Sequence, residues 1–302
     1  MHTVRSGAEL HRRWWTPWLW VLPALIVVGS FGLLPFANTI LLSFTDARPL
    51  GGPATLVGFE NYVTLWNDSA FWRSITNSLL YLVCVVPLLV LLPLLLAVLV
   101  QPKIPMIGFF RSAYYLPVIS STVVVGLAWQ MLLKDDGQIN TLLDQAGLVS
   151  EALPFLSDSM MILFCAMALT LWKGLGYYMV LYLAALANVD RSLYEAAELD
   201  GAGAVRRFWH VTLPGIRTMT YLVAVLSAIG SLRVFSEVYL LGGENGGPGG
   251  QSATIAFYIR KVGLDAMTGN LGLAGAASVV LFLLTFFLIL ASQRLNARSE
   301  AR

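Results

Sequence analysis

The chain has 302 residues, of which 57% are hydrophobic and 12% are charged. A soluble domain carries about 25% charged residues, and the mean hydropathy of this chain is +0.73. The composition therefore excludes an ordinary soluble enzyme and predicts an integral membrane protein, while the net charge of +2 does not by itself indicate a partner.

Six apolar runs are long enough to cross about 30 Å of hydrocarbon as helices. They are Trp18–Leu42, Leu79–Val100, Ala113–Leu133, Met160–Ala187, Thr218–Leu241 and Leu271–Ala291. We reject a signal peptide for the first run because it is long, contains two prolines and has no small-x-small cleavage site. The prediction is an all-α polytopic membrane protein, with a transmembrane domain over 18–291 between terminal segments 1–17 and 292–302.

Lysine and arginine are distributed unevenly between the two sides of these spans. With the N-terminus inside, the inner segments hold Arg5, Arg12, Arg13, Lys103, Arg111, Arg191, Arg206, Arg207, Arg217, Arg294, Arg298 and Arg302. The outer segments hold Arg48, Arg73, Lys134, Arg260 and Lys261. Because cytoplasmic loops are enriched in positive charge, we predict that both termini and the 188–217 loop lie in the cytoplasm, as in a multi-pass protein of the bacterial plasma membrane.

The outer loops suggest no independent domain. Aromatic residues in Ser43–Ser78 favour a helix lying at the membrane surface. Lys134–Ser159 is acidic and is interpreted as a solvated loop. Gly242–Gly250 is rich in glycine and lacks the Gly-Lys-Ser/Thr of a phosphate loop, so it is interpreted as a bend.

Chemistry-bearing residues are sparse. Cys84 and Cys165 both lie in apolar runs, where core thiols are more common than a disulfide. The three histidines are scattered, so no metal site is predicted. None of the four lysines follows a glycine, which excludes a Walker A lysine. We therefore expect no catalytic residue and no bound cofactor, and any ATP-dependent step would need a separate subunit.

The charged stretch Ser192–Pro214 separates two apolar runs. Ser192 and Glu195 have the spacing of a capping box, which predicts a helix starting near Leu193. Gly201 is a natural helix stop, and a second turn-rich segment follows. Two short helices of this kind are not stable alone and need a partner surface.

This stretch resembles the EAA loop of permease subunits of bacterial ABC importers. The resemblance is carried by Glu195, Ala196, Ala197, Asp200, Gly201, Leu213 and Pro214. Val211 stands where the family usually has isoleucine, and Thr218 where it often has a second proline. The resemblance implies a cytoplasmic coupling helix that docks on an ATPase subunit, with ATP and Mg²⁺ bound by that partner.

Segments elsewhere are similar to the carbohydrate-uptake branch of these permeases, which includes the maltose-system F permease and the A permeases of sugar and glycerol-phosphate systems. These segments are Gly58–Tyr62, Arg111 with Tyr115–Pro117, Trp129, Gly137 with Asn140, Trp172–Lys173 and Arg233–Tyr239. Ser236 stands where the branch often has aspartate. The resemblance implies a second homologous permease, two ATPase subunits and an extracytoplasmic binding protein or lipoprotein as partners, and no nucleic acid.

Charged residues inside spans are costly and usually face a partner or a water-filled cavity. Arg233 and Glu237 are four residues apart, so on one helix they would share a face and could pair. This face could line a translocation path, or the pair could be structural. Lys173 could snorkel to the outer surface, and the prolines Pro87, Pro93 and Pro117 predict bends. Other path candidates are Tyr239, Trp129 and Tyr177.

The substrate is left open at this stage. A sugar is the first interpretation, and Arg233 would also suit glycerol 3-phosphate or a glycerophosphodiester. An intramembrane transferase would need paired acidic motifs at one membrane face. A secondary transporter would predict internal repeats, and neither feature is visible in the sequence.

Overall fold

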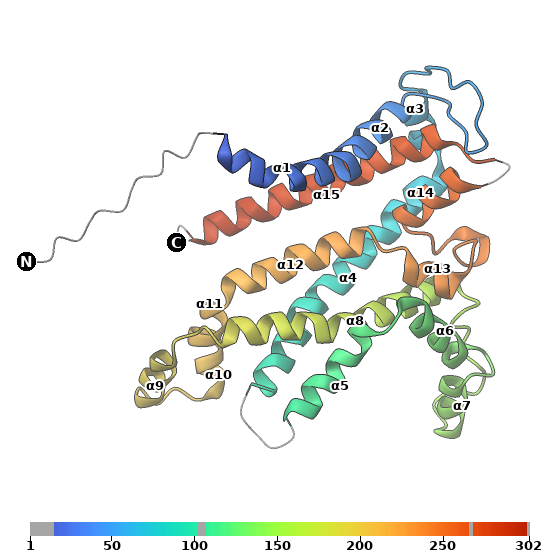
Figure 1. Cartoon of the computed structure of the whole chain (residues 1–302). Coiled ribbons are helices and arrows are strands. Elements are labelled where there is room, and N and C mark those ends of the chain that lie inside the picture. The colour runs from blue at the N-terminus through green and yellow to red at the C-terminus, as the bar shows by residue number, and fades with distance from the viewer. Residues whose placement is uncertain (1–14, 102–106, 266–267, 301–302) are drawn as a thin grey trace, which may run out of the picture.

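The structure is a computed structural model that describes residues 15–101, 107–265 and 268–300. Within these ranges the chain is helical, with one isolated bridge between Thr45 and Leu56 and no strand, which confirms the all-α prediction (Figure 1). The helices are α1 (Thr16–Val28), α2 (Leu34–Leu42), α3 (Glu60–Asn67), α4 (Ser69–Leu99), α5 (Ile107–Ile119), α6 (Thr122–Leu133), α7 (Gln138–Gln145), α8 (Ser159–Leu186), α9 (Arg191–Leu199), α10 (Ala204–Arg207), α11 (Leu213–Gly215), α12 (Arg217–Leu232), α13 (Ser236–Gly242), α14 (Ile255–Leu264) and α15 (Leu271–Glu300). Two π-helical segments, η1 (Gly29–Leu33) and η2 (Phe208–Thr212), and the 3₁₀ turn η3 (Pro248–Gly250) complete the set.

Some predicted features lie outside the described residues. These are Arg5, Arg12, Arg13, Lys103, Arg302, His2 and His11. At the other end of the chain, α15 continues to Glu300, so the segment 292–302 begins as part of the last helix.

Four helical stretches of the described chain are long and apolar enough to span a membrane. They are Trp18–Leu42, Ser69–Leu99, Ser159–Leu186 and Leu271–Arg294. Two further spans exist if each of two bent helix pairs is counted as one, namely Arg111–Ile119 with Thr122–Gln145 and Ala204–Gly215 with Arg217–Leu232. The protein is therefore a multi-pass membrane protein, and the prediction of six transmembrane helices holds only in part.

The third predicted span, Ala113–Leu133, is not one helix. The chain bends by 101° between the two parts of this region, and the break falls at Ser120 and Ser121, where Ser121 has an extended ψ of 129°. Pro117 lies in the preceding turn and lacks the amide that would continue the hydrogen-bond ladder. The bend predicted from Pro117 is therefore found here as a break in the span, whereas Pro87 and Pro93 lie inside an α4 that continues past both.

The fifth predicted span, Thr218–Leu241, is also interrupted. Helix α12 ends at Leu232 and α13 begins at Ser236. The Thr254 hydroxyl donates a 2.7 Å hydrogen bond to the carbonyl of Val234 inside the gap. Because hydrocarbon offers no water to bond a free carbonyl, non-helical backbone is tolerated there only where the protein supplies partners. The buried Thr254 supplies one of them.

The segment after α13 is held by α4. The Asn77 amide donates to the carbonyls of Gln251, at 2.7 Å, and Ala253, at 2.9 Å. The Ser78 hydroxyl accepts from the Ile255 amide at 2.9 Å. Loop residues 242–250 form a turn with left-handed glycines, which agrees with the predicted bend. The α4 side chains therefore position this turn and the start of α14.

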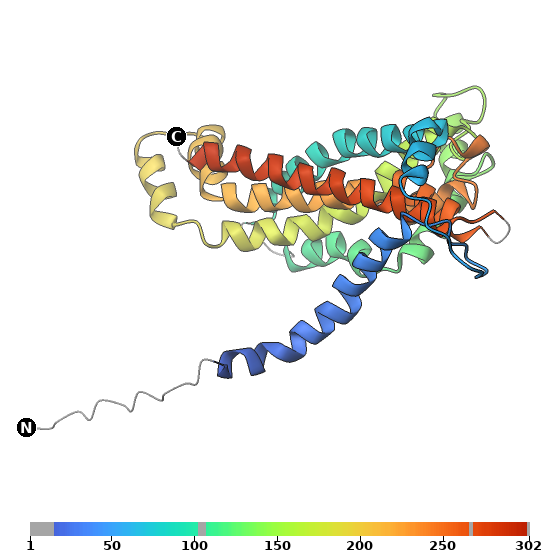
Figure 2. The same cartoon turned by 90° about the horizontal axis from the view of Figure 1, so that it is seen from above.

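Helices α4, α8 and α12 form the centre of the bundle, and α5 packs against α8. Their main core includes the fully buried Tyr81, Tyr182, Met179 and Val223. A second buried cluster joins α3, the start of α4, α14 and α15. Figures 1 and 2 show α9, α10 and α11 at one end of the bundle and α6, α7, α13 and α14 at the other. Figure 2 also shows α1 diverging from the bundle, and none of the apolar window of the stretch Trp18–Leu42 is buried inside the chain.

The outer loop before α4 contains α3, a short helix with exposed aromatic residues. Trp66 of α3 packs on Trp72 of α4 with ring centroids 5.0 Å apart, and the Trp72 indole nitrogen donates to the Trp66 carbonyl at 2.8 Å. A helix in this loop agrees with the sequence interpretation, and its location at a membrane surface stays a prediction. In the acidic loop, Asp158 caps α8 by accepting from the Met160 and Met161 amides.

Gly176 allows α5 to approach α8 closely. A Cβ atom at this position would lie 2.0 Å from the Tyr114 carbonyl oxygen, so any larger side chain must push two helix backbones apart. We predict that Gly176→Ala destabilises the purified protein by about 1–3 kcal/mol or more, the usual cost of overpacking, measured as a fall in its melting temperature in detergent.

Gly230 of α12 is the matched control. A Cβ atom there would meet nothing within 4 Å, and alanine in an unhindered helix is favoured over glycine by about 0.5–1 kcal/mol. Gly230→Ala should therefore leave the melting temperature unchanged or raise it. Equal effects of the two substitutions would contradict the close approach.

Candidate functional site

The first candidate site is the 188–217 loop at the α9 end of the bundle. Helix α9 begins after Asp190, whose carboxylate accepts a 2.9 Å hydrogen bond from the Ser192 amide. Donation from the Ser192 backbone and side chain lowers the pKa of Asp190 below its usual value. The predicted capping box was wrong, because Asp190 rather than Ser192 is the N-cap residue and the helix starts two residues earlier than expected.

Glu195 has a different partner from the one predicted. It forms an ion pair with Arg191 across one helical turn, at 3.7 Å, with 92% and 68% of the Arg191 and Glu195 side chains exposed. Exposed pairs of this kind are screened by water and contribute little to stability. The Glu195 carboxylate is consequently accessible at the surface of the loop.

Gly201 ends α9 as the sequence predicts. Its φ is +71°, a left-handed conformation that side chains with a Cβ rarely adopt. The Gly201 amide donates to Glu198 and the Ala202 amide donates to Ala197, which closes the last turn. The chain then turns back through α10.

The returning arm contains α10, η2 and α11. In η2 the Leu213 amide bonds the Phe208 carbonyl, five residues earlier, and Pro214 follows without an amide of its own. Leu213 is half-buried against the main core, whereas Pro214 is exposed. The arm then bends by 72° into α12. Leu213 and Pro214 therefore lie where the loop joins the bundle.

The surface of the loop exposes large apolar side chains that the motif did not single out. Leu199 is 90% exposed, Val205 73% and Trp209 58%. Glu195, Ala196, Asp200 and Gly201 of the predicted motif are exposed beside them, and Ala197 is half-buried. Large apolar side chains exposed in one charged loop are typical of a protein interaction surface. A count of apolar residues in an otherwise charged loop would have indicated it.

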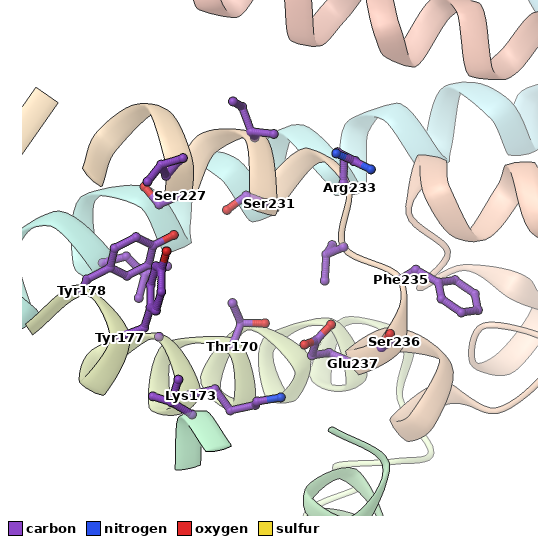
Figure 3. Close-up of a pocket in the computed structure, with 17 residues that line it drawn as sticks. Thr170, Lys173, Tyr177, Tyr178, Ser227, Ser231, Arg233, Phe235, Ser236 and Glu237 are labelled. Carbon is purple, nitrogen blue, oxygen red and sulfur yellow. The ribbon is translucent and has the colours of Figure 1, made fainter. Parts of the chain in front are cut away.

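The second candidate site is a cavity of about 600 Å³ at the break between α12 and α13 (Figure 3). It is lined by Leu89, Val118, Thr170, Lys173, Gly174, Tyr177, Tyr178, Leu226, Ser227, Ile229, Gly230, Ser231, Arg233, Val234, Phe235, Ser236 and Glu237. Small-molecule sites have volumes of about 300–1,000 Å³. The size and the mixture of hydroxyl, aromatic and charged groups suit a polar ligand.

The predicted Arg233–Glu237 pair does not form. Arg233 follows the last residue of α12, while Glu237 lies in the first turn of α13, and Figure 3 shows them on different sides of the cavity. The two ion pairs found within the described residues are both in the 188–217 loop. The four-residue spacing was misleading because the chain is not helical between the two positions.

Lys173 lies near the middle of α8, and its amino group donates to the Thr122 hydroxyl at the start of α6. The neighbouring α6 thus provides a polar partner inside the bundle, and the side chain lines the cavity. Its reach to an outer membrane surface stays a prediction. Lys173, Arg233 and Glu237 thus bring two cations and one carboxylate to a single cavity from three separate segments.

Of the three aromatic residues predicted to line the path, one lies in the cavity and two lie outside it. Tyr177 lines the cavity. Trp129 packs on Trp172 with centroids 6.1 Å apart, and Tyr239 stacks on Phe235 at 5.3 Å; neither is among the lining residues. The Arg260 guanidinium lies 4.6 Å from the centre of the Tyr239 ring, a cation–π geometry. Trp129 and Tyr239 therefore support neighbouring elements.

Several hydroxyl groups of the cavity were missed from the sequence. Thr170, Ser227, Ser231 and Ser236 all line it. The buried Ser231 hydroxyl has no hydrogen-bond partner within the described chain, so it is available to a ligand. Serines four residues apart on one face of an apolar helix, as at 227 and 231, are the signal that could have found two of them.

Metal and thiol chemistry find no support in the described residues. No group of three or more histidine, cysteine, aspartate or glutamate side chains gathers there. Cys84 and Cys165 are both free, with Cys165 buried. The two candidate sites are therefore a surface loop and a polar cavity.

Residues 66–302 match the family model for the binding-protein-dependent transport system inner membrane component. The chain belongs to this family. It is a transport permease, and the prediction of a transport subunit without an ATPase site of its own is confirmed, because the relatives below are permease subunits. This membership excludes the intramembrane transferase and the secondary transporter.

The relatives also confirm the predicted resemblance to the carbohydrate-uptake branch. The permease is 34% identical to the lactose transport system permease protein of Rhizobium radiobacter, over 80% of this chain and 81% of that one. It is 28% identical to the sn-glycerol-3-phosphate transport system permease protein of Pectobacterium atrosepticum, over 93% and 94% of the two chains.

A solved structure shares the fold. The permease superposes with a TM-score of 0.80 and 24% identity on a chain of a bacterial alginate ABC transporter in complex with a periplasmic protein that holds an alginate pentasaccharide. The match covers 94% of each chain. At this identity the likeness establishes the fold of the permease.

The Asp190 cap yields a prediction for the permease. Asp190→Ala removes the acceptor for the Ser192 amide and should increase trypsin cleavage after Arg191 at neutral pH. Asp190→Asn keeps an acceptor, since asparagine is an equally good N-cap, and should cleave like the parent protein. Equal cleavage of the alanine variant and the parent would contradict the cap.

The lowered pKa of Asp190 fixes the sign of a pH effect. A carboxylate whose pKa is lower in the folded state stabilises the fold above its unfolded value, near 3.8, and this stabilisation is lost as the pH falls through the folded value. The start of α9 should therefore be insensitive to pH above that value and weaken below it. Asp190→Asn should remove this dependence, as followed by hydrogen exchange of the Ser192 amide.

Proposed function

We propose that this permease is one half of the translocation path of an ATP-driven importer for a mono- or oligosaccharide. It would assemble with a second homologous permease, two ATPase subunits that bind ATP and Mg²⁺, and an extracytoplasmic binding protein or lipoprotein. The observation that carries the proposal is the direct connection of the exposed 188–217 loop to α12, the helix that lines the cavity.

The loop has the features that docking to an ATPase requires. Its apolar residues Leu199, Val205 and Trp209 are exposed, and Glu195 and Asp200 lie at the same surface. Interfaces gain most of their affinity from a few large side chains surrounded by polar groups. The match of Glu195, Ala196, Ala197, Gly201, Leu213 and Pro214 to the EAA loop supports the same partner.

The charge distribution supports a cytoplasmic location for this loop and for both termini. The loop and its flanks hold Arg191, Arg206, Arg207 and Arg217, in the pattern of cytoplasmic loops. The α14 end would then face the binding protein. A reporter fused after Asn188 should read as cytoplasmic and one after Asp144 as external, and opposite signals would overturn this orientation.

The cavity supports a hydroxylated substrate. Free and partly free hydroxyls from Ser231, Ser227 and Ser236, with the rings of Tyr177 and Tyr178, can bond and stack on a sugar. An alternative is glycerol 3-phosphate or a glycerophosphodiester, which the two cations Lys173 and Arg233 favour. A screen of the partner binding protein against sugars and glycerophosphodiesters separates the two classes of substrate.

The cavity residues give a test of the path. Arg233→Ala and Glu237→Ala should each lower uptake of the compound found in that screen by about tenfold or more, as expected for hydrogen bonds to charged groups. The complex should still assemble, because neither side chain has an ion-pair partner among the residues that the structure describes. Lys134→Ala, at an exposed position outside the cavity, is the control. Loss of assembly would show that Arg233 or Glu237 is structural.

Coupling is tested at the loop. Glu195→Lys reverses the charge at the docking surface, and Gly201→Asp forces a side chain into a left-handed conformation. Both variants should insert and assemble. In both, loaded binding protein should no longer stimulate ATP hydrolysis, and substrate uptake should be lost. Parent levels of both activities in either variant would remove this loop from the coupling mechanism.

A further inference from the structure

The backbone between α9 and α12 contains several conformational joints. Gly201 is left-handed, with φ of +71°, and the non-helical link 201–203 separates α9 from α10. Ile216 has φ of −110° and ψ of 14°, outside helical geometry, at the 72° bend into α12. A displacement of α9 could be absorbed at these joints unless side chains bridge them.

One side-chain hydrogen bond bridges the first joint. The Tyr194 hydroxyl of α9 lies 3.1 Å from the Thr212 hydroxyl at the end of η2. Tyr194 is half-buried, and Thr212 is 5% exposed, so water competes weakly for this bond. The contact joins positions 18 residues apart and bypasses both the glycine link and α10.

Thr212 continues the connection across the second joint. Its carbonyl accepts a 3.1 Å hydrogen bond from the Ile216 amide, and Ile216 is 2% exposed within the main core. The Thr220 amide of α12 in turn donates to the Ile216 carbonyl at 2.9 Å. A continuous series of short contacts therefore leads from Tyr194 to the helix that carries Ser227 and Ser231 into the cavity.

A second contact ties the other end of α9 to the returning arm. Arg207 and Glu198 form an ion pair at 3.4 Å, with 31% and 72% of their side chains exposed. Because Glu198 is largely in solvent, this pair is screened and weaker than a buried contact. The Arg207–Glu198 pair limits rotation of α9 about Tyr194, while the Tyr194–Thr212 bond fixes the distance between α9 and the end of η2.

We propose that Tyr194 and Thr212 are positioning residues that make the 188–217 loop a rigid lever, so that movement of the loop reaches α12 and the cavity. The inference rests on the proposed coupling function of the loop. It adds two residues outside the EAA motif whose hydroxyl groups, rather than their bulk, transmit the movement. Neither hydroxyl needs to contact the ATPase or the substrate.

The test uses the complete reconstituted transporter and needs no identified substrate. In a background with Cys84 and Cys165 replaced by alanine, Ser236→Cys provides one reporter thiol in the cavity lining. Its labelling rate by a polar maleimide is measured in nanodiscs with and without MgATP and vanadate, which trap the ATPase subunits. The ratio of the two rates reports movement at the cavity, and ATP hydrolysis is measured in parallel.

Tyr194→Phe and Thr212→Val each remove one hydroxyl and keep the shape of the side chain. Both should bring the labelling ratio about two- to tenfold closer to one, which is the factor that corresponds to the net free energy of one hydrogen bond. The rate of ATP hydrolysis without binding protein should stay at the parent value. Thr212→Ser keeps the hydroxyl and should restore the ratio. Tyr221→Phe is the matched control, since it removes a 3.3 Å bond to Ser292 between α12 and α15, and should leave the ratio unchanged.

A parent ratio in both Tyr194→Phe and Thr212→Val overturns the inference. So does a parallel loss of assembly and hydrolysis that Thr212→Ser does not rescue, because that result assigns the bond a structural role alone. Glu195→Lys distinguishes failure of the loop's coupling function from failure of the Tyr194–Thr212 contact alone. If it also keeps the parent ratio, the coupling function of the loop fails, whereas a changed ratio in Glu195→Lys alone restricts the failure to Tyr194 and Thr212.

Discussion

The cavity depends on hydrogen bonds to backbone groups that no helix satisfies. Thr254 bonds the carbonyl of Val234, and Asn77 bonds the carbonyls of Gln251 and Ala253. In an apolar environment an unpaired carbonyl is costly. Thr254 therefore helps the chain to leave helical geometry at 233–235, and Asn77 holds the segment that carries Thr254. Without that interruption, Arg233 and Glu237 would continue one helix and the cavity would lose its lining of α13.

The same interruption explains how charges are accommodated within the bundle. Lys173, Arg233 and Glu237 come from α8, the α12–α13 gap and α13, and they share one polar space. A charge isolated in hydrocarbon is unfavourable, and a water-filled or ligand-filled cavity lowers that cost. Lys173 gains an additional partner in Thr122, which lies just beyond the second helix break, between α5 and α6.

The two sites are connected through a single helix. Helix α12 begins at the bend that follows Leu213 and Pro214, and its other end carries Ser227 and Ser231 into the cavity. Rigid packing of α12 against α4 and α8 favours movement of these elements as a body, because close-packed interiors deform little. The loop end and the cavity end can therefore respond to one another without a continuous polar pathway between them.

The sequence by itself determined the membrane class, the apolar runs, the position of the loop and the left-handed stop at Gly201. These features follow from composition and from local backbone preferences, which act within a few residues of chain. The EAA match and the resemblance to carbohydrate-uptake permeases were likewise readable from residue types and spacing, and the relatives confirm the resemblance.

Only the tertiary structure decided where the helices break and which residues meet. The spacing of Arg233 and Glu237 predicted a pair, but Thr254, on a distant segment, stabilises the break that separates them. Asp190 displaced Ser192 as the cap of α9 because its carboxylate, two residues earlier in the chain, accepts from the Ser192 amide and so starts the helix before the serine. Lys173 found Thr122, which lies 51 residues away. Each outcome depends on a hydrogen bond whose partner is set by proximity in space or by competition between neighbouring residues. The local sequence pattern contains neither kind of information.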